Sequence, residues 1–235
     1  MKKFFLSFAL LFATYFTYAQ LEVGVTGGYG TTWLLNKSIS DSPDIDYKPS
    51  FAGYYGLQGT LFINNQIGFG IELNFATIKQ GYEAQDNSDF TATERIKFTE
   101  IPLLLKLKSE GGFYFEVGPK FSFVGKATQD VEAGAVKEDD VDIKAGVNGS
   151  MISGLIGFGG RFNLSENIDL SVGLRICGNF NNINKEFTKA ELNNEDVGIS
   201  CFYGNIDKNG DENYIKTWAL TGSLNFGLTY RIGGE

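Results

Sequence analysis

Apolar and polar residues alternate with a period of two in eight stretches of this chain. In the third stretch, for example, Glu72 lies between Ile71 and Leu73. Such alternation is typical of β-strands that have one apolar face and one polar face. It predicts strands at residues 21–31, 51–63, 67–79, 95–108, 113–124, 151–164, 168–178 and 215–232.

The connections between these strands alternate between long and short. The short ones are residues 64–66, 109–112 and 165–167, and the long ones are residues 32–50, 80–94, 125–150 and 179–214. Each strand has at least the ~9–11 residues that a tilted strand needs to cross a bilayer. Short turns on one side and long loops on the other are typical of outer-membrane barrels. We therefore predict an all-β fold, an eight-stranded antiparallel up-and-down transmembrane β-barrel with short periplasmic turns and four long extracellular loops.

The main structural alternative is an exported, soluble, ligand-binding barrel with its apolar face turned inward. The polar strand face consists mostly of Gly, Ser, Thr and Asn, with few of the Lys and Glu residues that cover a soluble protein. This composition favours the membrane barrel, in which the bulky apolar face meets lipid and the small and charged residues fill the interior.

The N-terminal segment has the features of an export signal. Met1-Lys2-Lys3 is followed by an apolar run from Phe4 to Phe16 and by Thr17-Tyr18-Ala19. The run is shorter than the ~20 residues of a membrane-spanning helix, and the order of the three parts is that of a signal peptide. We predict a signal peptide at residues 1–19 and a barrel domain at residues 20–235.

Composition narrows the possible functions. The chain has 30 Gly, 21 Phe, 11 Tyr and 2 Trp, but no His and only 2 Cys. Without histidine there is no Ser-His-Asp triad and no His-ligated metal site. The 28 acidic residues outnumber the 20 basic ones, whereas a nucleic-acid partner requires a basic face. We expect no enzyme activity, no cofactor, no metal and no nucleic-acid partner.

The negative charge is concentrated in the predicted loops. The four long connections carry net charges of −1, −4, −3 and −4 in chain order, or −12 together. Acidic, solvated loops favour a role at the cell surface. We expect outer-membrane lipid and lipopolysaccharide as surroundings, a possible protein partner at the extracellular loops, and a monomer.

Charged residues on the polar strand face predict a salt-bridged interior. Eight strands enclose just enough space for side chains, and buried charges must be paired. If the 109–112 turn closes a hairpin, residues whose numbers sum to about 220 face each other, so that Glu100 faces Lys120 and Leu104 faces Glu116. The predicted interior charge network is Glu72, Glu100, Lys106, Glu116, Lys120, Arg161 and Arg175, with Glu22 and Arg231 on the same face.

Two smaller sites are predicted at the outer rim. Lys79, Arg95 and Lys97 flank the 80–94 loop and are candidates for contact with lipopolysaccharide phosphates. Cys177 at the end of a strand and Cys201 in the longest loop form a possible disulfide, because exported proteins meet an oxidising compartment.

Three segments resemble the PorT-like outer-membrane β-barrel family. Phe98–Lys106 (FTEIPLLLK) resembles its E-I-P-L-L-L-K strand, Phe115–Pro119 the strand that follows, and Leu224–Ile232 its terminal strand. The resemblance implies an eight-stranded barrel in the outer membrane of a Gram-negative bacterium, and some members are linked to secretion machinery or surface attachment. It also implies that Pro102 and Pro119 are tolerated, and we predict a bulge at each because proline cannot donate to the ladder.

These observations lead to two functional hypotheses. The first is a small integral outer-membrane barrel with a closed, side-chain-filled interior and a structural or surface-interaction role. The second is an accessory barrel of a secretion or transport system.

Overall fold

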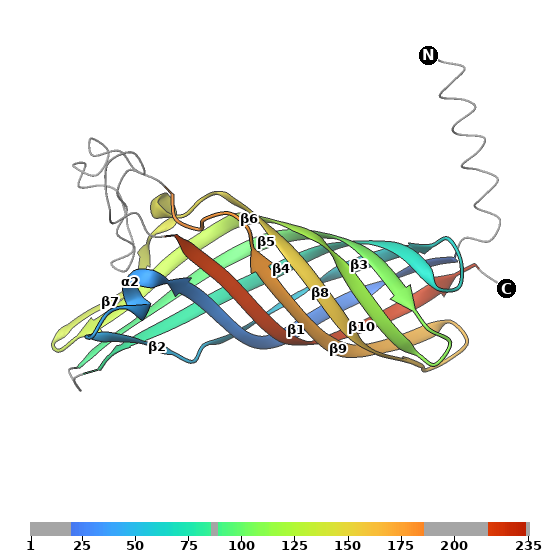
Figure 1. Cartoon of the computed structure of the whole chain (residues 1–235), viewed down its shortest axis with the longest axis horizontal. Coiled ribbons are helices and arrows are strands. Elements are labelled where there is room, and N and C mark those ends of the chain that lie inside the picture. The colour runs from blue at the N-terminus through green and yellow to red at the C-terminus, as the bar shows by residue number, and fades with distance from the viewer. Residues whose placement is uncertain (1–19, 86–88, 186–215, 234–235) are drawn as a thin grey trace, which may run out of the picture.

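Eight antiparallel strands form a closed ring in the computed structural model, which describes residues 20–85, 89–185 and 216–233 (Figure 1). The predicted signal peptide and Cys201 lie outside these residues. Strand β1 pairs with β3 on one side and with β10, the last strand, on the other, which closes the barrel. The ring strands are β1 (Gln20–Asn36), β3 (Phe51–Phe62), β4 (Ile67–Ala84), β5 (Phe90–Lys108), β6 (Phe113–Ala133), β8 (Ser150–Asn163), β9 (Ile168–Asn179) and β10 (Thr217–Ile232). The predicted eight-stranded barrel is confirmed.

Four short elements lie outside the ring. Strand β2 (Ile45–Lys48) pairs with β4, and strand β7 (Val136–Asp142) pairs with β6. Helix α2 (Lys37–Ser40) follows β1, and a 3₁₀ turn covers Lys144–Gly146. Figure 1 shows α2, β2 and β7 together at one end of the barrel, opposite the short turns. Within the described segments, no helix has the length and hydropathy needed to cross a membrane.

Two of the predicted long loops consist largely of strand. Strands β4 and β5 remain paired out to Glu83 and Thr91, and β6 continues to Ala133 and then turns back into β7. The prediction ended these strands too early because their outward positions become polar beyond residue 79. Their inward positions continue the alternation with Tyr82 and Ala92, both buried. A sheet thus continues outside the membrane. It consists of the outer ends of β4, β5 and β6 together with β2 and β7, and we call it the extracellular sheet.

The two faces of the strands differ in the direction that the membrane interpretation requires. Leu57 and Ile71 point outward and are 61% and 55% exposed, whereas the inward neighbours Gln58 and Glu72 are 8% and 2% exposed. Apolar side chains therefore surround the barrel and polar side chains fill it. A soluble barrel would have the opposite arrangement, so that alternative is wrong.

The predicted bulges at the prolines are wrong. Pro102 pairs in register with Lys120, and Pro119 pairs in register with Gly154. The register shift between β5 and β6 lies between Lys97 and Phe98, which makes Gly125 the extra residue. A missing proline N–H interrupts the ladder locally without inserting a residue, whereas glycine is a frequent bulge residue.

Candidate functional site

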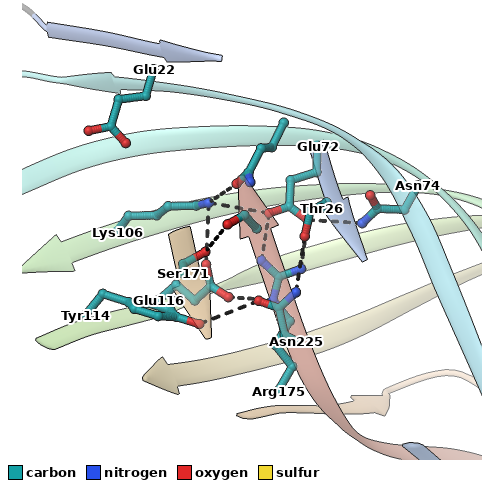
Figure 2. A network of polar contacts seen from close by, with 12 residues as sticks. Glu22, Thr26, Glu72, Asn74, Lys106, Tyr114, Glu116, Ser171, Arg175 and Asn225 are labelled. Carbon is teal, nitrogen blue, oxygen red and sulfur yellow. Dashed lines mark hydrogen bonds and ion pairs between the residues drawn. The ribbon is translucent and has the colours of Figure 1, made fainter. Parts of the chain in front are cut away.

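Four charged side chains meet near the middle of the barrel interior, in what we call the central cluster (Figure 2). Both terminal nitrogens of Arg175 donate to the Glu72 carboxylate, at 2.7 and 2.8 Å. The Arg175 Nε donates to Glu116 Oε1. The Lys106 Nζ lies 3.4 Å from Glu72 and 3.5 Å from Glu116. Two acids and two bases from β4, β5, β6 and β9 therefore neutralise one another.

Neutral side chains complete the hydrogen bonds of this cluster. Arg175 Nη1 also donates to the Tyr54 hydroxyl at 3.0 Å, and that hydroxyl accepts a second bond from the Asn225 amide at 2.6 Å. Gln58 accepts from Lys106 at 3.0 Å, and Asn74 donates to Glu72 at 3.0 Å. Buried ion pairs need such additional bonds to offset their desolvation.

A second group, the periplasmic cluster, lies near the short turns. Arg161 contacts both Glu22, at 3.0 Å, and Asp169, at 2.7 Å. Lys108 adds a contact to Glu22 at 3.2 Å, and Arg231 a contact to Asp169 at 2.9 Å. Three bases and two acids join strands β1, β5, β8, β9 and β10 across the lumen.

Glu100 and Lys120 form a separate buried pair, with 2.7 Å between Oε1 and Nζ. The predicted register is nevertheless wrong. Glu100 lies opposite Ser122, and Pro102 lies opposite Lys120. The numbers of facing residues therefore sum to 222 instead of 220, and the Glu100–Lys120 ion pair is diagonal across the two strands. By the same shift, Glu116 faces Lys106 instead of Leu104. The alternation of apolar and polar residues predicts which face of the strand each residue occupies, but it does not predict the register across the turn.

Toward the extracellular end, many of the side chains in the barrel interior are apolar instead of charged. Leu34, Ile78, Ile96 and Phe98 point inward from β1, β4 and β5 and are at most 5% exposed. With residues from the neighbouring strands and loops they form one buried group, which we call the apolar plug: Leu34, Ile78, Ile96, Phe98, Ala127, Ile143, Val147, Met151, Ile183 and Ala219. No sequence prediction covered it. Ile96 and Phe98 have the inward parity of Glu100, but Ala127 follows the bulge at Gly125, and Ile143, Val147 and Ile183 lie outside the predicted strands.

Side chains fill most of the lumen between these groups. Two internal cavities have volumes of about 40 and 30 Å³. The first is bordered by Ile78 of the apolar plug and by the Glu100–Lys120 pair, and the second by members of both charged clusters. A water molecule needs about 10–15 Å³ of such a cavity. Each cavity therefore has room for a few waters, and not for a solute path.

All seven residues of the predicted interior charge network lie inside the barrel and make ion pairs: Glu72, Glu100, Lys106, Glu116, Lys120, Arg161 and Arg175. The prediction missed Lys108 and Asp169, which have the inward parity of Lys106 and Arg175. It also missed Tyr54, because residues 51–63 were interpreted from their apolar face.

Cys177 is buried inside the barrel, packed with Leu104 and Leu155, and forms no disulfide with another described residue. Cys201 lies outside the described residues, so their disulfide stays a prediction. Among the described residues, no group of His, Cys, Asp and Glu has an arrangement that could hold a metal ion.

Four bases gather on the outer surface, on the strands that continue into the extracellular sheet. Lys79 of β4 lies directly opposite Arg95 of β5, and Lys97 of β5 lies directly opposite Lys126 of β6. We call Lys79, Arg95, Lys97 and Lys126 the basic patch. The sequence prediction contained the first three; Lys126 was missed because the prediction ended this strand at residue 124 and placed Lys126 in the 125–150 loop.

Two acids touch this patch from its extracellular side. Asp130 forms an ion pair with Arg95, and Asp140 lies 3.7 Å from Lys126. Partial burial raises the pKa of the Asp130 carboxyl, but the Asp140 backbone N–H and the Arg95 guanidinium outweigh burial and hold that pKa below its ordinary value. Lys79 and Lys97 make no ion pair within the described part of the chain.

The closed ring, the apolar outer band and the charged interior define an integral outer-membrane β-barrel protein. The model of the outer membrane protein beta-barrel domain matches residues 17–232, and the chain belongs to this family. It is therefore a protein of the cell outer membrane. Comparison with curated proteins finds no significant match.

Similar solved structures include three outer-membrane proteins. OprG from Pseudomonas aeruginosa is 9% identical, with a TM-score of 0.41 over 92% of this chain and 96% of that chain. Ail of Yersinia pestis, in complex with the heparin analogue sucrose octasulfate, is 13% identical, with a TM-score of 0.39 over 90% and 99%. The outer membrane protease OmpT from Escherichia coli is 9% identical, with a TM-score of 0.38 over 92% and 97%.

Proposed function

We propose that this protein is a closed outer-membrane barrel whose function is carried by its extracellular surface, in a structural or surface-interaction role and without catalysis. The observation that carries the proposal is the filled lumen. Two ion-paired clusters occupy its periplasmic and central parts, and the apolar plug occupies its outer part. A pore would need a continuous water-filled path, whereas the cavities inside have room for only a few waters.

The extracellular sheet supplies a surface for such a role. It has its own small core, in which Ile39, Tyr82 and Ala92 are buried. Acids that are exposed or half-exposed lie on several of its strands: Glu83, Glu132, Glu138 and Asp139. A surface held by its own core binds a partner with less loss of conformational entropy than a flexible loop. We infer that a protein partner with a basic surface fits this sheet.

The resemblance to the PorT-like family keeps one alternative open, an accessory barrel for secretion or transport. That role also uses a partner protein, so the two hypotheses differ in the process that fails when the surface is altered. We treat the protein as a monomer in both.

One experiment with two readouts tests the proposal. Cells carry either Glu138→Gln with Asp139→Asn on β7, or Glu110→Gln with Glu166→Gln at two periplasmic turns as a control with the same change in charge. Surface adhesion and protein secretion are scored separately, and heat-modifiable gel mobility checks barrel assembly. We expect adhesion to fall at least twofold for the β7 variant only, with secretion unchanged.

A secretion defect with normal adhesion would favour the accessory role. Planar-bilayer recordings of the wild-type barrel address the closed lumen directly, with a porin in the same bilayers as the positive control. We expect no steady conductance, and a porin-sized ohmic current would overturn the proposal.

A further inference from the structure

In the basic patch, like charges lie directly opposite each other on neighbouring strands. Lys79 faces Arg95, and Lys97 faces Lys126, on three adjacent strands. Side chains directly opposite each other in an antiparallel pair have Cβ atoms about 5 Å apart, and like charges at such positions destabilise the sheet. The two acids nearby belong to the extracellular side of the patch and contact only Arg95 and Lys126. The patch retains a net positive charge that an external anion can neutralise.

The position of the patch relates it to the membrane. Toward the periplasm on β4, the outward residues after Lys79 are Thr77, Phe75 and Leu73; on β5, those after Lys97 are Thr99 and Ile101. Phe75 and Leu73 are 47% and 42% exposed and belong to the apolar band. The order along both strands is therefore base, threonine, apolar residue, which matches the order of phosphate, sugar and acyl chain in a membrane glycolipid.

A groove on the lipid-facing surface begins just below. Its outward lining comes from β1, β3, β4 and β5: Val25, Leu57, Gly59, Ile71, Leu73 and Ile101. It encloses about 660 Å³. Gly59 forms its floor, and a Cβ atom built on Gly59 would meet no heavy atom within 4 Å. The groove therefore exists because this outward position lacks a side chain.

The groove and the patch are close enough for one molecule to occupy both. On β5, Ile101 of the groove and Lys97 of the patch are four residues apart, which is about 13 Å at ~3.3 Å per residue. On β4, Leu73 lines the groove and Lys79 belongs to the patch. An acyl chain can span the ~13 Å between Lys97 and Ile101. A free anion would contact the bases of the patch and leave the groove empty.

We propose that the basic patch and the groove form one binding site for a phosphorylated, acylated glycolipid of the outer leaflet. Its phosphates bind between Lys79 and Arg95 and between Lys97 and Lys126, where charge-assisted hydrogen bonds to phosphate oxygens are strong. One acyl chain lies in the groove over Gly59. The inference rests on the outer-membrane location of the barrel and is independent of the surface role proposed above.

The experiment measures retention of one defined lipid. The barrel is folded in dodecyl maltoside, bisphosphorylated hexa-acylated lipid A is added, and native mass spectrometry counts the bound molecules. The test variants are Lys97→Gln with Lys126→Gln, which removes half of the patch, and Gly59→Phe, which fills the groove. The matched controls are Lys48→Gln with Lys137→Gln, two exposed bases elsewhere, and Gly178→Phe, an outward glycine on β9 that also has room for a side chain. Heat-modifiable mobility confirms that every variant is folded.

We expect one lipid A molecule on the wild type and on both controls. Affinity should fall at least tenfold in the double lysine variant and for dephosphorylated lipid A on the wild type, and several-fold in Gly59→Phe. Wild-type affinity in the double lysine variant, or equal binding of dephosphorylated lipid A, would overturn the site. Full displacement of lipid A by micromolar pyrophosphate, or an unaltered Gly59→Phe variant, would overturn the acyl-chain part and leave a site for a free phosphate.

Discussion

The charged side chains inside the barrel and those of the basic patch follow opposite rules. In the ion-paired groups of the lumen, six bases meet five acids, and each base contacts at least one acid: Lys106, Lys108, Lys120, Arg161, Arg175 and Arg231 with Glu22, Glu72, Glu100, Glu116 and Asp169. Outside, the four bases of the patch stand base opposite base. The first arrangement satisfies its charges within the protein, and the second leaves charge for a ligand.

The local environment explains the difference. In the water-poor lumen an unpaired charge has a large desolvation cost, so the bases and acids of the two clusters and of the Glu100–Lys120 pair lie in groups that neutralise one another. At the membrane rim, water and headgroups screen the same side chains, and repulsion between neighbours costs a few tenths of a kcal/mol to about 1 kcal/mol. The same residue type therefore has a structural role on one face of β5 and is free for binding on the other.

The largest expected effect is on the central cluster. Replacing Arg175 with Met leaves Glu72 and Glu116 with Lys106 as their shared base, and we expect the free energy of unfolding to fall by about 3–5 kcal/mol. Urea unfolding in phospholipid vesicles measures it. Lys97→Met removes a charge from the outer patch and should change stability by less than about 1 kcal/mol.

Equal losses in the two variants would contradict the comparison, because they would mean that inner and outer charges contribute alike. The Glu100–Lys120 pair provides a second test of the same rule. Glu100→Leu leaves Lys120 buried without its acid, and adding Lys120→Met should recover most of the lost stability, since apolar replacement of a whole buried pair is often neutral.

A smaller effect is expected at the outer patch itself. Lys97→Glu turns the Lys97–Lys126 repulsion into an attraction, and should raise the free energy of unfolding by about 0.5 kcal/mol at low salt in a detergent without phosphate. The gain should shrink at about 1 M salt, where charges are screened within ~3 Å. Lys137→Glu, on the exposed β7, is the control. A loss of stability in Lys97→Glu would show that the patch is not repulsive.

The sequence was sufficient for the ring and for the parity of its faces, because strand periodicity is a local signal. Inward charges such as Glu72 and Arg175 follow directly from that parity. Contacts across the lumen do not, since the partners of Arg175 come from strands distant in sequence, and turn geometry decides whether Glu100 faces Lys120 or Ser122. Lys126 was assigned to the 125–150 loop because the apolar alternation of this strand ends at Val124, and the bulge at Gly125 changes the parity of the residues beyond it.

The smallest expected effect concerns Asp130, where the basic patch meets the extracellular sheet. The Asp140 N–H and Arg95 favour the charged carboxylate and, against the effect of partial burial, hold its pKa below the ordinary value of 3.8. A group whose pKa is lowered by folding stabilises the fold above its unfolded pKa and loses that contribution as the pH falls through the folded pKa. The link between β6 and β7 should therefore weaken below about pH 4, by less than about 1 kcal/mol because the pair is partly exposed.

Amide hydrogen exchange of β7 at pH 6 and pH 3, after correction for the intrinsic rate, measures this change, and Asp130→Asn should remove the difference. Protonation of Asp130 also releases Arg95 from its acid. If the basic patch binds a phosphorylated lipid, Asp130→Asn should retain lipid A at pH 6, where the phosphates keep their charge, no more weakly than the wild type. Weaker retention in Asp130→Asn at pH 6 would mean that Asp130 holds Arg95 in place for the lipid instead of competing with it.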